Sequence, residues 1–175
     1  MTAAEAPVRV NIGCGNKRLP GYFGVDKYAC AGADLRCDAM STLPFRDDSV
    51  DEVLMDNFIE HVLDVPALMQ EVLRVCRGGA RVTVITPHFT ALASWRDPTH
   101  VHHFSYFSMD HFQKDSVAHY IGKGFRIEQK KLSFGGGLLG LLGRLIFAIS
   151  PEAYEKNYCF VFRASTLTFR LLVGK

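Results

Sequence analysis

The first 57 residues contain four short β-rich segments, and each segment ends in a glycine turn or in an aspartate or asparagine. Branched and aromatic residues favour strands, and glycine and aspartate after them favour turns. The carboxyl ends of parallel strands meet at one edge of a sheet, so these endings predict a polar rim there. The segments are residues 8–12, 22–25, 33–37 and 50–55, followed by Gly13-Cys14-Gly15, Asp26, Asp38 and Asp56-Asn57.

The next segment predicts an amphipathic helix. Asp64 is placed to cap it, and Pro66 falls in the first turn, where a missing N–H costs nothing. Gly78-Gly79 predicts its end. A strand over 81–86 follows, apolar enough to be buried on both faces. Apolar residues recur along the helix at three- and four-residue steps and form one stripe, namely Val65, Leu68, Met69, Val72, Leu73 and Cys76.

The second half of the chain continues this alternation. Ser108 predicts a helix start, with the helix running to about residue 120, and residues 125–132 and 165–173 are expected as strands. The apolar segment at about 134–150 is expected to be a buried or cleft-lining helix. Strands that alternate with helices predict an α/β class fold, a Rossmann-like and mostly parallel sheet with helices on both faces, built as one domain over 1–175.

Composition excludes several classes of protein. Hydrophobic residues make up 48% and charged residues 22%, as in ordinary globular proteins. A formal net charge of +2 with scattered basic residues argues against a nucleic-acid partner. The longest apolar run, 138–149, is interrupted by Arg144 and is far shorter than the roughly 20 residues of a membrane span. Five cysteines without a CxxC pair, and an N-terminus without a signal peptide pattern, favour a cytoplasmic location.

The Gly13-Cys14-Gly15 turn is a candidate ligand loop. The dinucleotide-binding pattern needs a third glycine where this chain has Arg18, and an acid about 20 residues further on. Here Asp26 follows Gly15 after only eleven residues. A ligand without a pyrophosphate does not need that third glycine, so S-adenosylmethionine fits this loop better than a dinucleotide.

Asp26 and Asp38 extend the candidate site. A carboxylate accepts hydrogen bonds from two ribose hydroxyls, which suits Asp26 at the end of the second strand. Asp38 would accept from the exocyclic amine of adenine, with Ala39 and Met40 against the ring. Each aspartate taken alone is a common turn residue, but the order of the set favours an adenosine site.

These residues lie within segments that resemble the class I S-adenosylmethionine-dependent methyltransferases, in particular their type 11 branch. The matching segments cover about half of the chain and read VRVNIGCGN, YFGVD, RCDAMSTLPFRDDSVDEV, NFIEHV and EVLRVCRGGARVTVITPHF. The resemblance implies a seven-stranded sheet whose last strand is antiparallel, with S-adenosyl-L-methionine as the cofactor. It places the methionine end at Gly13 and Gly15, the ribose at Asp26, the adenine at Asp38 and the sulfonium beside Asn57 to Ile59.

The resulting cofactor-binding candidates come from three parts of the sequence. They are Asn11, Gly13, Cys14, Gly15 and Asn16 from the first turn, Asp26, Asp38, Ala39 and Met40 from the next two, and Asn57, Phe58, Ile59 and His61 after the fourth strand. The crossover from Gly13 to Tyr22 is too short for a covering helix, so that face of the sheet is expected to lie open or to pack on another copy. A homo-oligomer is expected on this ground.

A segment rich in histidine and aromatic residues, at about 88–107, is the expected substrate loop. Methyl transfer to a hydroxyl or amine needs alignment and a base that takes a proton. His88, His100 and His103 are the candidates for this base, and Asp97 is the candidate for orienting one of them. His61, a cofactor-binding candidate, has a second interpretation as a helix-start residue that packs against the sheet.

Several alternatives remain open. The histidines and aromatics of this loop could serve packing alone. Metal ligation by His88, Asp97, His100, His102 or His103 is weighed as well, and the favoured interpretation includes no metal site. The expected function is methyl transfer to a small-molecule acceptor carrying a hydroxyl, a sugar or an amine. A cofactor-binding but non-catalytic partner subunit, or a nucleotide-dependent oxidoreductase, are the alternatives.

Overall fold

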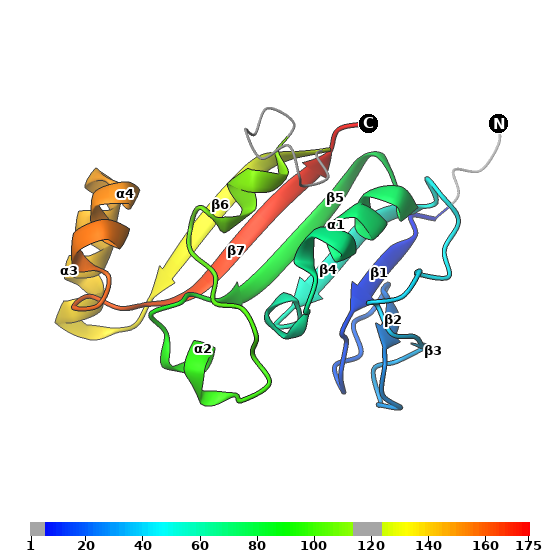
Figure 1. The fold of residues 1–175 in the computed structure, drawn as a ribbon, viewed down its shortest axis with the longest axis horizontal. Coiled ribbons are helices and arrows are strands. Elements are labelled where there is room, and N and C mark those ends of the chain that lie inside the picture. The colour runs from blue at the N-terminus through cyan, green and yellow to red at the C-terminus, as the bar shows by residue number, and fades with distance from the viewer. Residues whose placement is uncertain (1–5, 114–123) are drawn as a thin grey trace.

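A computed structural model describes residues 6–113 and 124–175, and its strands form one seven-stranded sheet (Figure 1). The strand order is β3-β2-β1-β4-β5-β7-β6. Strands β1 to β5 pair in parallel, and β7 runs antiparallel to both of its neighbours. The predicted Rossmann-like sheet is confirmed. The bounds are β1 Arg9–Ile12, β2 Phe23–Asp26, β3 Leu35–Arg36, β4 Val50–Asp56, β5 Cys76–Pro87, β6 Phe125–Phe134 and β7 Ala164–Val173.

Helix α1 (Val65–Val75) forms as its sequence predicts. The Asp64 side chain accepts a hydrogen bond from Ala67 N at 2.9 Å and caps the helix, with a proline in the first turn. Its apolar stripe is buried against the sheet. The helix ends before Cys76, and Gly78-Gly79 belongs to β5 rather than to the helix end.

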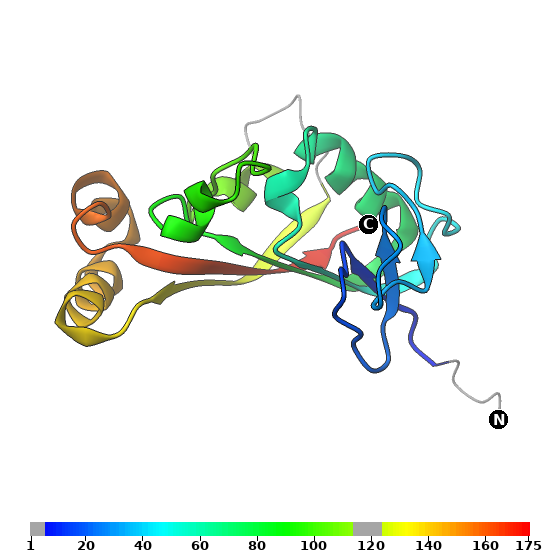
Figure 2. The ribbon, with the colours of Figure 1, turned by 90° about the horizontal axis from the view of Figure 1, so that it is seen from below.

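The helical layers are uneven. In Figure 2, α1 and α2 lie above the sheet, and no helix of the described residues lies beneath β1, β4 and β5. No helix stands between β1 and β2, as the short crossover predicts. The remaining helical segments are η1 Ile59–His61, α2 Leu92–Arg96, η2 Ser108–Phe112, α3 Gly137–Ile149, α4 Pro151–Ala153 and η3 Tyr154–Tyr158. The predicted helix from Ser108 to about 120 begins as the short η2, and its second half lies outside the described residues.

The uncovered face of the sheet carries charged side chains on β1, β4 and β5, so this part of it does not need a second helical layer. Glu52 on β4 lies between Arg9 on β1 and Arg81 on β5 in the strand register. Arg9 Nε and Glu52 Oε2 are 3.2 Å apart. The expectation that the strand over 81–86 is buried on both faces is wrong, because exposed Arg81 and half-buried Thr83 alternate with buried Val82 and Val84.

Helix α3 lies at the far end of the β6–β7 hairpin, away from β1, β2 and β3 (Figure 1). The predicted helix forms, but its predicted burial is wrong. Its buried residues are Gly140 and Gly143, and a Cβ on Gly140 would lie 1.9 Å from the Gly135 carbonyl oxygen. The small side of the helix therefore packs inward and its leucines face out, with Leu138 70% and Leu145 53% exposed. No helix within residues 6–113 and 124–175 is long and apolar enough to cross a membrane.

Candidate active site

A pocket of about 390 Å³ lies where β1, β2 and β4 end. In Figure 1 the carboxyl ends of the central strands point to the edge where α2 lies. The crevice outside these ends is where open α/β sheets bind ligands. The residues that line the pocket are Gly13, Val25, Asp26, Lys27, Tyr28, Cys37, Asp38, Ala39, Met40, Asn57, Phe58, His61, Val62 and Thr99.

The turn after β1 requires glycine at its first position. Gly13 has a φ of +69°, and a Cβ there would lie 2.2 Å from the Phe58 ring. Gly15 has a φ of +51°, and a Cβ there meets no atom within 4 Å. The two glycines thus share a left-handed backbone, but only Gly13 brings the chain into close contact with the segment after β4.

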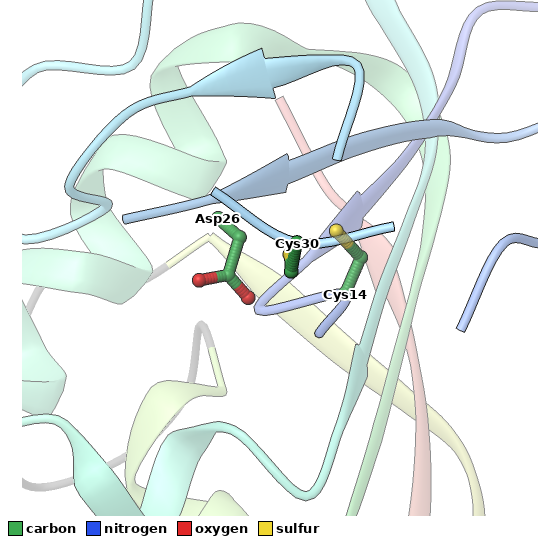
Figure 3. Close-up of side chains that lie close together, drawn as sticks. All are labelled: Cys14, Asp26 and Cys30. Carbon is green, nitrogen blue, oxygen red and sulfur yellow. The ribbon is translucent and has the colours of Figure 1, made fainter. Parts of the chain in front are cut away.

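Asp26 is held at the pocket by two backbone amides. Its Oδ2 accepts from Gly15 N at 2.9 Å, and its Oδ1 accepts from Tyr28 N at 2.9 Å. Figure 3 shows this carboxylate beside the side chains of Cys14 and Cys30. Burial, and then the neighbouring Cys30, raise the pKa of the Cys14 thiol to about 11.

The segment after β3 forms another wall of the pocket. Asp38 Oδ1 accepts from Met40 N at 2.9 Å, which closes a tight turn. Ala39 is buried, whereas Met40 and the opposing Tyr28 are exposed to solvent. This wall presents a carboxylate next to apolar surface, the combination expected around an adenine ring.

Asn57 has an unusual backbone conformation where β4 ends. Its φ is +53°, which is uncommon outside glycine. Its backbone N donates to Ile85 O at 2.8 Å, and its side-chain Nδ2 donates to Asp56 Oδ1 at 2.9 Å. The left-handed turn carries the chain directly to Phe58 and η1, which begins at Ile59.

His61 is oriented by a chain of hydrogen bonds. The Thr99 hydroxyl donates to Asp97 Oδ1 at 2.6 Å, and Thr99 Oγ1 lies 2.9 Å from His61 Nδ1. Since the Thr99 proton is engaged with Asp97, Thr99 Oγ1 accepts from His61 Nδ1–H. The proton on Nδ1 leaves the lone pair of the neutral ring on Nε2. Hydrogen bonding from Thr99 lowers the pKa of Asp97.

His100 lies beside His61, with ring centroids 4.6 Å apart. Its Nδ1 is 3.1 Å from the Ser94 carbonyl oxygen, which can only accept, so Nδ1 carries the proton here as well. Glu60 is 1% exposed, and its Oε2 accepts from the Thr86 hydroxyl at 2.9 Å. Burial raises the pKa of the Glu60 carboxyl, and its Oε1 has no hydrogen-bond partner.

The other two candidate bases lie elsewhere. His88 is fully buried, with Nδ1 2.7 Å from Thr90 Oγ1 and Nε2 3.0 Å from Glu155 Oε1. His103 bonds Ser94 Oγ through Nδ1 at 2.8 Å and stacks on Trp95. None of the three candidate bases lines the pocket, and His100 lies beside it only through its contact with His61.

The structure brings most of the predicted cofactor residues together. Eight of the thirteen line the pocket, namely Gly13, Asp26, Asp38, Ala39, Met40, Asn57, Phe58 and His61. The other five, Asn11, Cys14, Gly15, Asn16 and Ile59, do not line it. Sequence reasoning missed Tyr28 and Thr99, because they reach the pocket through loops whose course no local pattern reveals. It also missed Glu60, which lies in η1 between Ile59 and His61.

Comparison with known proteins shows which family part of this chain resembles. Residues 10–84, less than half of the chain, match a family model described as a methyltransferase domain. This segment contains nearly all of β1, then β2 to β4, α1 and most of the pocket. The segment thus resembles a methyltransferase domain, and the chain has the Rossmann-like fold of S-adenosylmethionine-dependent methyltransferases. No curated protein sequence matches the chain.

Solved structures share the fold of this chain at low sequence identity. One is an S-adenosylmethionine-dependent methyltransferase from Archaeoglobus fulgidus, with a TM-score of 0.64, 19% identity, and coverage of 95% of this chain and 86% of that one. Another is the [4+2]-cyclase SpnF, with a TM-score of 0.63, 15% identity, and coverage of 97% of this chain and 76% of that one. A third is a complex between the Trm112 methyltransferase activator of Haloferax volcanii and a methyltransferase, with a TM-score of 0.59, 16% identity, and coverage of 100% of this chain and 86% of that one. The fold therefore supports more than one kind of activity.

Proposed function

We propose that this chain binds S-adenosyl-L-methionine in the pocket at β1, β2 and β4 and transfers its methyl group to a small-molecule acceptor. The observation that carries the proposal is Asp26, held at the pocket by the amides of Gly15 and Tyr28. A carboxylate fixed in this way suits the vicinal hydroxyls of a ribose.

The residues present fit this cofactor. Two carboxylates, Asp26 and Asp38, outnumber the one lysine, Lys27, among the pocket-lining residues, which suits a ligand that carries a sulfonium cation. Because Gly13 has no Cβ, its backbone can lie against Phe58, where a Cβ would collide with the ring. Ala39, Met40 and Val62 supply apolar surface for the adenine ring. The cofactor, when bound, supplies an activated methyl group.

The acceptor would approach beside His61 and Thr99. These residues close the pocket near Asn57 and Phe58, where we place the reacting end of the cofactor. Displacement at a methyl group needs the acceptor atom in line with the bond that breaks, so the principal task of this wall is alignment. Of the histidines proposed as bases, His100 is the one that lies against His61.

The acceptor is proposed to carry a hydroxyl, a sugar or an amine. We also propose that the protein works in the cytoplasm, because all five cysteines are unpaired thiols.

Transfer of a labelled methyl group tests this function. Purified protein, labelled S-adenosylmethionine and fractionated small molecules from a cell extract should give a labelled product. Asp26→Ala should lower the rate more than tenfold, whereas the surface variant Glu128→Gln should leave it unchanged. Equal rates for the wild type and Asp26→Ala would contradict the proposal.

A further inference from the structure

Three side chains beside the pocket each offer a metal-ligating atom. A carboxylate oxygen of Glu60 and ring nitrogens of His61 and His100 all lie within 4.8 Å of one another. They come from η1 and from the loop after α2, which backbone hydrogen bonds hold together. Val101 N donates to the Glu60 carbonyl oxygen at 2.9 Å.

The hydrogen bonds of the two imidazoles leave the same nitrogen available on each ring. His61 donates through Nδ1 to Thr99, and His100 donates through Nδ1 to the Ser94 carbonyl. Histidine ligands of metal ions characteristically donate their second N–H to a carbonyl, a carboxylate or another acceptor, which fixes the tautomer and the ring orientation. Both rings therefore present a lone pair on Nε2.

The buried carboxylate of Glu60 is an independent observation that points to a cation ligand. The residue is only 1% exposed to solvent, and its Oε1 lacks any hydrogen-bond partner. An unsatisfied buried carboxylate oxygen costs several kcal/mol in general, so proteins rarely leave one without a partner. A cation between the Glu60 carboxylate and the two imidazoles would give this oxygen a partner.

We propose that Glu60, His61 and His100 bind a divalent first-row transition ion such as zinc or iron. Two imidazoles and one carboxylate with open coordination positions are the ligands of catalytic zinc and mononuclear iron sites. Ligands about 2.1 Å from one ion lie roughly 3.4 Å apart. Movements of about an ångström therefore close the observed arrangement around an ion.

The second cluster of possible ligands in the described part of the chain is less suited. It comprises Cys14, Asp26 and Cys30. Both carboxylate oxygens of Asp26 already accept backbone amides, and the Cys14 thiol has its pKa raised to about 11 by burial. A thiol must lose its proton to bind a metal.

The ion would lie at the wall of the pocket, because His61 lines it. Its open positions would accept an oxygen or nitrogen of the methyl acceptor. This role toward the acceptor depends on the proposed function, whereas the ion site itself depends only on the geometry of the three ligands. With an ion bound, His61 and His100 serve as ligands rather than as free bases.

Zinc titration of the metal-free, untagged full chain tests the proposal by calorimetry, with metal content measured after dialysis. We expect one ion per chain. Glu60→Gln, which keeps a hydrogen-bonding group next to Thr86, and His100→Ala should each weaken binding more than about 100-fold, beyond the 10–100-fold cost of losing a second-layer partner. His102→Ala, two residues along the same loop, is the matched control and should bind as the wild type does.

Two further measurements separate the possible failures. Zinc should protect His61 and His100 of the wild type from modification by diethylpyrocarbonate, a result that does not depend on any variant folding. Affinity for S-adenosylhomocysteine is measured on the same samples. Cofactor binding without stoichiometric zinc, or zinc binding that Glu60→Gln does not weaken, would overturn the metal site and leave the proposed function intact. Stoichiometric zinc binding without affinity for S-adenosylhomocysteine would contradict the proposed function and leave the metal site intact.

Discussion

At the scale of single residues, the pocket depends on a few positions where backbone geometry and ligand chemistry coincide. Gly13 lets the turn after β1 approach Phe58, and Asp26 is fixed by two amides of neighbouring loops. Asn57 adopts a left-handed conformation at the end of β4. These constraints position the site before any ligand arrives.

Gly13→Ala and Gly15→Ala form a matched pair. Both replacements cost about 1–3 kcal/mol for a left-handed backbone. Only the Cβ at position 13 collides with Phe58, which must then move, and Phe58 lines the pocket. We expect Gly13→Ala to weaken binding of S-adenosylhomocysteine more than tenfold and Gly15→Ala to weaken it less, as measured by calorimetry. Equal effects would show that the Phe58 contact does not shape the site.

Cysteine labelling tests the burial of the Cys14 thiol. At pH 8 a thiol with a pKa of about 11 is ionised in roughly one molecule in a thousand, and only the thiolate reacts. Burial raises the pKa of Cys76 to about 12. We expect iodoacetamide to modify half-buried Cys30 before Cys14 and Cys76, as followed by peptide mass spectrometry, and all five cysteines after denaturation. Modification of Cys14 first would contradict the structure.

At the scale of elements, Glu71 on α1 ties the helix to the loop before β4. Its carboxylate accepts from Leu43 N at 2.6 Å and from Arg74 Nε at 2.8 Å. The same guanidinium donates to the Leu43 and Phe45 carbonyl oxygens. The Glu71–Arg74 ion pair thus forms hydrogen bonds with three backbone groups of a loop that has no secondary structure of its own.

Glu71→Gln should lower the free energy of unfolding by about 1–3 kcal/mol at pH 7, the usual range for hydrogen bonds to charged groups. Hydrogen bonding from Arg74 lowers the pKa of Glu71 in the folded state. The unfolded chain therefore binds the proton more readily, and the stabilisation is present above the unfolded pKa of about 4.3 and lost as the pH falls below it. Urea unfolding at several pH values measures this.

The difference between the wild type and Glu71→Gln should shrink as the pH approaches 4. Glu128→Gln, on the exposed surface of β6, is the control and should change stability by less than about 0.5 kcal/mol. A difference that grows on acidification would show that Glu71 is not stabilised as a carboxylate.

Elements with a strong local pattern could be predicted from the sequence, and the others could not. The stripe and cap of α1 are local, so its start at Val65 follows from Asp64 and Pro66. The burial of α3 could not be inferred, because two glycines rather than its leucines form the packed side. In the site, the glycines and aspartates after the strands were predictable. The roles of Glu60 and Thr99 were not, because they depend on how the distant loop after α2 returns to η1.

At the scale of the whole molecule, the apolar surface of α3 remains uncovered. It lies at the opposite end of the sheet from the pocket (Figure 1), so it does not form the acceptor wall expected of a cleft-lining helix. Solvent-exposed apolar patches of this kind are typical of interaction sites. The predicted homo-oligomer would bury this surface more favourably than the charged open face of the sheet.

Light scattering coupled to gel filtration tests this prediction. We expect the wild type to self-associate, and Leu138→Glu with Leu145→Glu to yield a monomer of unchanged thermal stability. Arg170→Glu, on the open face of the sheet, should leave the association unchanged. A wild type that is monomeric at every concentration would contradict the prediction. Dissociation of the oligomer by Arg170→Glu would show that the interface lies on the open face of the sheet.

We propose that the rim of β1, β2 and β4 is an adenosine-binding site for a methyl donor. Calorimetric titration of S-adenosylhomocysteine into the folded wild-type chain measures this binding. We expect saturable binding at one site per chain, weakened more than tenfold by Asp26→Ala. Absence of heat and of competition with S-adenosylmethionine, in a sample whose circular dichroism shows the folded state, would contradict it.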